Sequence, residues 1–364
     1  RVKPIIENIK NYKDYFLVDN ISICDPAPLS DSDKQNFDKI CLNIEDEIVE
    51  NNVNEYLEDF KIINIPDGGE ELAKYFQKFV NNQQKNKYDL KAFIATNNSL
   101  INLLNKGIIP LNKNNFLHLD IKGPNVLRKE ESRRIFTRLI DWGLSGTYKS
   151  GKIPQFVKNK PLQFNLPFGI ILFSKIKWNG KLIDIKNFIK LFPPKYPKLK
   201  LAKFIYTNSY KKGHDEYIRK NIVPVMGEWA LSQDAVGLEF LKTEDFLPEN
   251  IIINNISAIL KDFEDEEGNF NDVKYFDEVF CPNVDVYGLL ICYLPIVLET
   301  FKITFIKHPH DNLLINEIWM MLVEFCFSTQ YATKPIPVKT IHKKLKNLNN
   351  FIYPIKSPKT RSYR

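Results

Sequence analysis

The sequence predicts an α+β protein with short strands in its first half and strongly apolar helices toward its C-terminal end. Its 364 residues are enough for two domains or one two-lobed unit, at roughly 150 residues per domain. Short β-prone segments lie between residues 14 and 143, whereas the strongly apolar segments 283–305 and 312–327 predict buried helices. The apolar share of 44% and the charged share of 26% exclude a disordered, collagen-like or coiled-coil chain.

Strands and helices are predicted in turn along the first half of the chain. Strands are predicted over 14–24 and 60–65. The segments 115–127 and 134–143 are each predicted to form a strand and a loop. Helical spacing of apolar residues predicts helices over 70–80 and 89–105, and Gly107 is expected to end the second. The charged run RKEESR is expected to be the turn between the last two strands.

The second half is less regular until its apolar helices. Residues 151–213 are rich in proline and lysine and predict irregular structure. The tail from Lys334 is basic and is expected to be loosely held. Val286–Leu298, the longest apolar stretch, has 13 residues, too few to span a bilayer, so no membrane span is expected. The five cysteines form no C-x-x-C pair, which favours a reducing compartment over a disulfide framework.

Charge is unevenly distributed. The net charge is +7, yet residues 331–364 alone hold nine Lys or Arg and no acid. Residues 175–212 hold eleven lysines and one acid, and residues 43–60 hold seven acids and no Lys or Arg. These blocks predict separate surfaces. The lysine-rich block could engage an acidic substrate, nucleic acid or capsid protein, but a solvated insertion is favoured, so no nucleic-acid partner is expected.

One segment carries most of the chemical information. It is HLDIKGPN over 118–125, followed by Asp141-Trp142-Gly143, with sixteen residues from Asn125 to Asp141. Carboxylate and amide oxygens suit Mg²⁺, which takes few protein groups together with phosphates. A nearby lysine can balance charge on a transferred phosphoryl group, and a free aspartate can accept a hydroxyl proton. The combination predicts phosphoryl transfer from a nucleotide. The alternative is an ordinary pair of buried strands with unrelated polar residues.

HLDIKGPN resembles the catalytic loop of protein kinases, and IDWG resembles their metal-binding D-F-G segment. The resemblance implies that Asp120 orients the substrate hydroxyl and accepts its proton, and that Lys122 contacts the γ-phosphate of ATP. It implies that Asn125 and Asp141 hold Mg²⁺. Lys122 also favours serine/threonine over tyrosine specificity, and argues against a small-molecule kinase of the same fold.

The same resemblance extends to residues around the motif. His118 is expected to pack near Trp142, and Asp285 in DVYG is expected to brace the backbone of the loop. Pro167 matches the proline of the segment that closes the activation region, but Phe168 replaces its glutamate. The family's buried Glu–Arg pair is therefore expected to be absent.

FKIINIPDGGE over 60–70 resembles the hinge between kinase lobes. The resemblance implies that Ile63 is the gatekeeper, that the backbone of Asn64, Ile65 and Pro66 faces the adenine, and that Glu70 contacts the ribose. Pro66 departs from the family, because proline has no N–H to donate to adenine. A tight turn is the plainer interpretation of IPDGG.

Two further departures concern activation and completeness. Leu119 replaces the arginine of H-R-D that reads an activation-loop phosphate, so activation by phosphorylation is not expected, although Ser145, Thr147 and other hydroxyls are present. No G-x-G-x-x-G precedes Gly68, and the early pair Lys3 and Glu7 is too close together to supply the strand lysine and its partner. We expect a small lobe that is incomplete at its N-terminus, with the phosphate-covering loop upstream. Loss of that loop would instead make a pseudokinase.

The resemblance implies a bilobal kinase-like fold with a smaller β-rich lobe and a larger, mainly helical lobe. Residues 1–65 would form part of the small lobe, 66–330 the large lobe with an insertion at about 174–282, and 331–364 a basic tail. The sequences of these motifs are similar to those of serine/threonine kinases of large nucleocytoplasmic DNA viruses, including giant viruses. That implies a place in the host cytoplasm, at virus factories, and in virions, with capsid or virion components as partners beside a Ser/Thr protein substrate. The alternative function is a non-catalytic scaffold.

Overall fold

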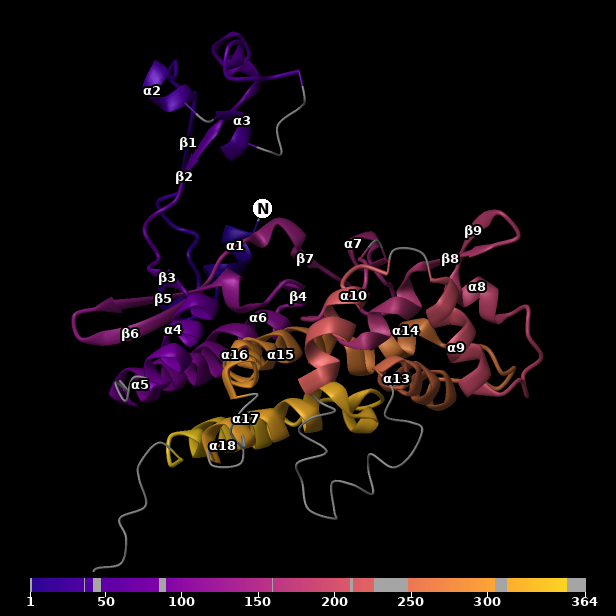
Figure 1. Cartoon of the computed structure of the whole chain (residues 1–364). Coiled ribbons are helices and arrows are strands. Elements are labelled where there is room, and N and C mark those ends of the chain that lie inside the picture. The colour runs from indigo at the N-terminus through magenta and orange to yellow at the C-terminus, as the bar shows by residue number, and fades with distance from the viewer. Residues whose placement is uncertain are drawn as a thin grey trace, which may run out of the picture. The chain divides into compact units, whose positions relative to one another are not determined.

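The protein is α+β, as predicted, with about 56% helix and small antiparallel sheets (Figure 1). The computed structural model describes residues 2–35, 37–41, 47–84, 90–158, 160–209, 212–225, 248–304 and 313–351. The predicted insertion at about 174–282 is thus described except for 210–211 and 226–247, and the predicted basic tail only to residue 351. The chain separates into two compact units, Leu17–Gly68 and the remainder, Arg1–Phe16 with Gly69–Arg364.

The Leu17–Gly68 unit is built on one two-stranded ribbon. Strand β1 (Ser22–Cys24) pairs antiparallel with β2 (Ile62–Asn64), with Ile23 opposite Ile63, and every residue of both strands is exposed. The helical elements are α2 (Asp31–Lys34), α3 (Phe37–Ile40) and the 3₁₀ turns Val53–Glu55 and Leu57–Asp59. The prediction of a strand from residue 14 is wrong before Ser22, because Tyr12–Asp14 form a 3₁₀ turn and Asn20 adopts a left-handed φ of 55° that interrupts an extended run. Within its described residues, this unit is less β-rich than predicted.

The larger unit contains the remaining sheets. The three-stranded sheet has the order β3-β5-β6, from β3 (Glu70–Glu71), β5 (Val126–Glu131) and β6 (Arg134–Leu139). Strand β4 (Phe116–Leu117) pairs with β7 (Gly146–Thr147), and β8 (Lys175–Trp178) pairs with β9 (Lys181–Asp184). The predicted turn RKEESR is shorter than expected, because β5 continues to Glu131 and only Ser132 and Arg133 turn the chain. Both have positive φ, 49° and 66°, which suits a two-residue hairpin turn.

Helices make up most of the larger unit. In chain order they are α1 (Lys3–Ile6), α4 (Leu72–Gln84), α5 (Leu90–Asn102), α6 (Ile109–Lys113), α7 (Gln155–Lys158), α8 (Ile185–Ile189), α9 (Lys198–Asn208), α10 (Asp215–Tyr217), α13 (Pro248–Asp262), α14 (Asp272–Tyr275), α15 (Cys281–Ile291), α16 (Leu294–Thr304), α17 (Leu313–Leu322) and α18 (Val338–Leu348). Among its described residues, the 3₁₀ turns besides Tyr12–Asp14 are Gly123–Asn125, Trp142–Leu144, Phe168–Phe173 and Thr329–Tyr331, and the π turns are Leu103–Ile108, Ile218–Ile222, Phe276–Phe280 and Val323–Phe327.

The predicted helix over 70–80 is confirmed as α4, and its expected apolar face is buried: Leu72, Phe76, Phe79 and Val80. The predicted helix over 89–105 exists, but it does not end at Gly107. A π-helical turn, Leu103–Ile108, carries the chain directly from α5 into α6. Gly107 is there for space, since a Cβ at this position would lie 2.9 Å from Cβ of Tyr15.

The apolar segments near the C-terminal end form the core, as predicted. Helix α15 is buried from Asn283 to Ile291, and α16 packs between α4 and α17. The continuous helical run Asp272–Phe301 is long and apolar enough to cross a membrane by length and composition, but 89% of its most apolar window is buried inside the protein. Burial of this kind is also what the core helix of a folded domain shows.

Two segments predicted to be irregular or loosely held contain regular elements. Residues 151–213 contain the β8–β9 hairpin and helices α7, α8 and α9, because apolar residues such as Ile176, Phe188 and Ile205 give each element a buried side. The tail beyond Lys334 forms α18, whose Ile341 and Leu345 are buried and which packs on α5 and α17. Periodic apolar residues among the lysines explain the helix. Residues 352–364 lie outside the described part.

Candidate functional site

The loop 118–125 joins β4 to β5, and Asp141 lies two residues beyond the end of β6. Because Val126 at the start of β5 pairs with Leu139 at the end of β6, the two motifs meet at one end of the hairpin. The backbone N–H of Ile140 donates to the carbonyl oxygen of Asn125 at 3.0 Å. Residues 125 and 141, which the resemblance implies hold the same ion, therefore lie on neighbouring chain segments.

Asp120 is the centre of the loop's polar network. Its side chain is nearly buried, and the residue is 2% exposed. Oδ2 accepts hydrogen bonds from Lys122 Nζ and Asn125 Nδ2, both at 2.9 Å, and Oδ1 accepts one from Asn165 Nδ2 at 3.1 Å. Asn125 Nδ2 also donates to the carbonyl oxygen of Asp120 at 2.9 Å. Three of the sequence-predicted residues thus form one hydrogen-bonded group.

Helix α15 holds the start of the loop. Asp285 Oδ2 accepts from the backbone N–H of His118 and Oδ1 accepts from that of Leu119, both at 2.9 Å, as expected of the aspartate in DVYG. Asn112 Nδ2 donates to the same carboxylate at 2.7 Å. Gly288 follows one helical turn later, and a Cβ there would lie 2.7 Å from the carbonyl oxygen of Ile121. In the sequence DVYG, Asp285 therefore accepts hydrogen bonds from the loop, and Gly288 leaves space for the loop backbone.

His118 packs against Trp142 as predicted, with ring centroids 4.7 Å apart. Full burial disfavours the imidazolium ion and lowers the pKa of His118, although Asp285 opposes the shift. The neutral ring satisfies both neighbours when Nε2 carries the proton: Nε2 lies 3.0 Å from the carbonyl oxygen of Ile140, and Nδ1 accepts from the N–H of Asp120 at 3.3 Å. His118 is therefore a structural link between the two motifs.

The residues expected to hold a metal have oxygen atoms to offer. Asn125 uses its amide nitrogen on Asp120, which leaves its Oδ1 as the atom for a cation. Asp141 is exposed and adopts φ 62° and ψ 74°, and it accepts a 3.4 Å bond from the N–H of Gly143. Among the described residues no group of three or more His, Cys, Asp or Glu side chains could hold a metal. Amide and carboxylate oxygens are ligands that Mg²⁺ takes together with phosphates and water.

Two residues of the network were not predicted. Lys160 Nζ donates to the carbonyl oxygen of Leu119 at 3.3 Å, and Asn165 binds both Asp120 and the carbonyl oxygen of Ile121. Burial lowers the pKa of Lys160 to about 8, with the nearby Lys122 charge acting in the same direction and Asp120 against it. Lys158 and Lys160 both lie between the buried apolar residues Val157 and Leu162, so the sequence does not indicate which of the two lysines is buried.

The predicted nucleotide-facing residues divide between the two units. Ile63 and Asn64 belong to β2, Ile65 and Pro66 follow it, and Ile63 and Ile65 are each 58% exposed. Glu70 belongs to the larger unit, where its Oε2 accepts from Lys78 Nζ at 2.9 Å. Lys3 Nζ and Glu7 Oε1 form an exposed ion pair at 3.8 Å between residues four apart in the sequence, as their spacing indicates.

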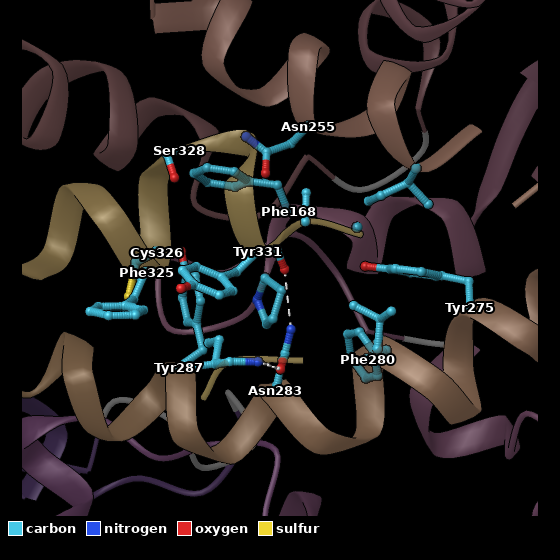
Figure 2. Close-up of a pocket in the computed structure, with 16 residues that line it drawn as sticks. Phe168, Asn255, Tyr275, Phe280, Asn283, Tyr287, Phe325, Cys326, Ser328 and Tyr331 are labelled. Atoms are coloured by element: carbon cyan, nitrogen blue, oxygen red, sulfur yellow. Dashed lines mark hydrogen bonds between the residues drawn. The ribbon is translucent and has the colours of Figure 1, made fainter. Parts of the chain in front are cut away.

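The segment around Pro167 is closed by packing. Phe168–Phe173 form a 3₁₀ helix in which all six residues are buried, and Tyr275 OH lies close enough to Gly169 to exclude a Cβ. A cavity of about 20 Å³, roughly the size of one water molecule, lies between this helix, α13, α15 and Tyr331 (Figure 2). Asn283 lines it, and its Nδ2 donates to the carbonyl oxygens of Tyr331 and Lys334. The cavity is too small for a substrate.

A larger groove of about 470 Å³ lies between residues 8–15 and the α5–α6 helix. Its polar lining consists of asparagines, Tyr15 and the lysines Lys10 and Lys106, without a carboxylate. None of the motif residues lines it.

No family model matches the chain, and searches of curated proteins and of solved structures also found no match. The chemistry of the site therefore rests on its own geometry.

Proposed function

We propose that the protein is a serine/threonine protein kinase with a bilobal fold that transfers the γ-phosphate of ATP to a protein hydroxyl. The observation that carries the proposal is the Asp120 network. One carboxylate is held by a lysine, by the amide that leaves its oxygen for a metal, and by a loop that α15 braces. In this proposal the base, the cation and one metal ligand lie on eight consecutive residues, which supports a role in phosphoryl transfer.

Asp120 acts on the acceptor hydroxyl. A carboxylate offers about four lone-pair positions, and three are taken by Lys122, Asn125 and Asn165. The remaining position can orient the substrate hydroxyl and receive its proton. Lys122 Nζ uses one of three N–H donors on Asp120, so the others can face the transferred phosphoryl group. Mg²⁺, held by Asn125 Oδ1 and the Asp141 carboxylate, would neutralise phosphate charge.

In the proposed complex, Ile63, Asn64, Ile65 and Pro66 face the adenine and Glu70 faces the ribose. Glu70 then has to exchange its bond with Lys78 for one with the sugar. Pro66 contributes no N–H, so adenine is held by one fewer backbone hydrogen bond than in the family that the motifs resemble.

The experiment is a phosphotransfer assay with Mg-ATP and Ser/Thr-containing protein substrates. Asp120→Asn keeps the shape of the side chain but removes the base, so turnover should fall at least 10²-fold. Asp184→Asn is the matched control, because Asp184 is exposed and makes no cap hydrogen bond at α8. Equal turnover by the wild type and Asp120→Asn would exclude the proposed role.

A non-catalytic scaffold that binds virion or other protein components is the second candidate. It is favoured by the burial of Asp120 behind its three donors and by the proline at position 66. Nucleotide binding separates the two, because a ligand at a hundred times its Kd raises the free energy of unfolding by about 2.7 kcal/mol. A thermal shift with Mg-ATP supports the kinase, and its absence supports the scaffold.

A further inference from the structure

Two buried side chains contact the 118–125 loop from a segment far along the chain. Lys160 is 5% exposed and Asn165 is 1% exposed, and both lie between α7 and the buried 3₁₀ helix Phe168–Phe173. The proposed phosphoryl transfer uses neither as a base, a metal ligand or a phosphate contact. Their position therefore needs another explanation.

Their hydrogen bonds reach three consecutive loop residues. Lys160 Nζ donates to the carbonyl oxygen of Leu119 at 3.3 Å. Asn165 Nδ2 donates to Asp120 Oδ1 at 3.1 Å and to the carbonyl oxygen of Ile121 at 3.3 Å. Asp285 meanwhile accepts the N–H groups of residues 118 and 119. The loop is thus held by its N–H groups from α15 and by its carbonyl groups from residues 160–165.

Backbone geometry shows why the loop needs such support. Leu119 adopts φ 61°, a left-handed conformation that costs a residue with a Cβ on the order of 1–2 kcal/mol. The peptide groups on both sides of this residue are the ones that Asp285 and Lys160 bind. Without these partners the loop would be free to relax, and the Asp120 carboxylate would move with it.

Burial of an ammonium group is costly, so the position of Lys160 is poorly explained by stability alone. Asn165 donates to Oδ1 of Asp120, whereas Lys122 and Asn125 donate to Oδ2. Because both oxygens have donors, the Asp120 carboxylate is fixed in one orientation. The chain also lacks, at Leu119, the arginine that reads an activation-loop phosphate in the proteins its motif resembles. The donors in these contacts are the Lys160 and Asn165 side chains themselves, so the contacts need no added phosphate.

We infer that Lys160 and Asn165 are positioning residues that fasten the segment 155–173 to the 118–125 loop, so that the site is assembled in the unmodified chain. The attachment itself is independent of any activity. Its consequence for turnover, which is that no phosphate on residues 145–150 is required, rests on the proposed kinase function.

The attachment is tested by hydrogen–deuterium exchange of the full chain. Lys160→Met and Asn165→Ala remove the donors, and peptides covering 118–125 and 155–165 should then exchange about tenfold faster or more, while peptides of α15 stay unchanged. Lys160→Arg retains a donor and should restore most of the protection. Lys158→Met, in the same segment, is the control and should match the wild type. Unchanged exchange in both Lys160→Met and Asn165→Ala would overturn the inference.

The functional consequence is measured separately. In an active preparation, Lys160→Met and Asn165→Ala should lower kcat by about 10²-fold through misplacement of Asp120 while KM for ATP stays within about threefold. Phosphatase treatment of the wild type should leave kcat unchanged. Loss of activity on dephosphorylation would overturn assembly in the unmodified chain. If the wild type transfers no phosphate, the kinase proposal fails and the exchange data alone decide the attachment.

Discussion

The ammonium group of Lys160 is a positive charge in a nearly buried environment. Its ammonium has one hydrogen bond, to the carbonyl oxygen of Leu119, and burial makes the neutral amine easier to form than in solvent. The charges that face it are Asp120, Asp285 and Asp141, which favour the ammonium, and Lys122, which opposes it. Burial outweighs the three carboxylates, so the pKa falls from 10.5 to about 8.

This shift predicts how stability changes with pH. Between about pH 8 and 10.5 the unfolded chain binds a proton at Lys160 that the folded chain does not, so the free energy of unfolding should rise with pH in this window. The rise attributable to Lys160 is on the order of 3 kcal/mol. Urea denaturation of the wild type and Lys160→Met at a series of pH values measures it, because other titrating groups cancel in the difference. A constant difference from pH 7.5 to 10.5 would contradict the lowered pKa.

At this scale the sequence predicted the residues whose spacing is local. Asp120, Lys122 and Asn125 lie within six residues, and their side chains meet as expected. Asn165 and Lys160 bind the same loop from 35 residues or more beyond it, and Asn112 reaches Asp285 across 173 residues. No spacing rule connects such positions, because the fold and not the chain brings them together.

Helix α5 is joined to the C-terminal part of the chain by one buried asparagine. Asn97 Nδ2 donates to the carbonyl oxygen of Leu345 at 2.7 Å and to Asn349 Oδ1 at 2.8 Å, while Tyr293 OH donates to Asn97 Oδ1 at 2.6 Å. The amide thereby connects α5, α18 and the turn between α15 and α16. Its removal would leave the buried Tyr293 hydroxyl and a carbonyl oxygen without these partners.

We expect Asn97→Ala to lower the free energy of unfolding by about 2–4 kcal/mol, since two buried polar groups lose their hydrogen bonds. Asn102→Ala is the matched control: the same residue type in the same helix, but exposed, with an expected change within about 0.5 kcal/mol. Chemical denaturation followed by circular dichroism provides both values. A similar, small effect of the two substitutions would show that α18 is not attached through Asn97.

Gly288 offers a test of the packing between α15 and the loop. Alanine is favoured over glycine in a helix by about 1 kcal/mol, so propensity alone predicts that Gly288→Ala stabilises the protein. The contact predicts the opposite, because the new Cβ would lie 2.7 Å from the carbonyl oxygen of Ile121 and 2.9 Å from its Cβ. We expect a net loss of about 1–3 kcal/mol and faster amide exchange in 118–125. A gain in stability would mean that the loop can move away without cost.

Elements with a clear apolar period were predictable, and their ends were not. The buried face of α4 follows from Leu72, Phe76 and Phe79, yet Gly107 lies inside a helix where the sequence suggested an end. A glycine that ends a helix and one that admits a neighbouring side chain look alike in a sequence. The neighbour here, Tyr15, is 92 residues away in the chain, so the residues around Gly107 could not predict this contact.

At the scale of the whole molecule, the Leu17–Gly68 unit leaves and re-enters the larger unit at one sheet. Phe16 forms a parallel bridge with Leu139 at the β6 edge, and the N–H of Leu139 donates to the carbonyl oxygen of Tyr15 at 2.9 Å. The chain returns at Gly69, and Glu70 pairs with Arg128 at the other edge. The larger unit therefore contains its own core and the whole Asp120 network.

This arrangement predicts that the larger unit folds without residues 18–67. The Phe16 segment lies beyond β6, and β3 is the strand at the opposite edge, so the two are three strand spacings apart, about 14 Å, which a linker of eight Gly and Ser residues can span. We expect the shortened chain to unfold cooperatively, with protected amides in α15. Insertion of the same linker at the β8–β9 turn controls for the linker itself.

The same variant separates the two parts of the proposed nucleotide site. If Ile63–Pro66 face the adenine, the full chain should gain thermal stability with Mg-ATP, whereas the shortened chain should lose that gain and still fold. An equal gain in both would place nucleotide binding entirely in the larger unit and remove Ile63–Pro66 from the site. Aggregation of the shortened chain with an intact linker control would contradict the independence of the larger unit, since its core would then require contacts from 18–67.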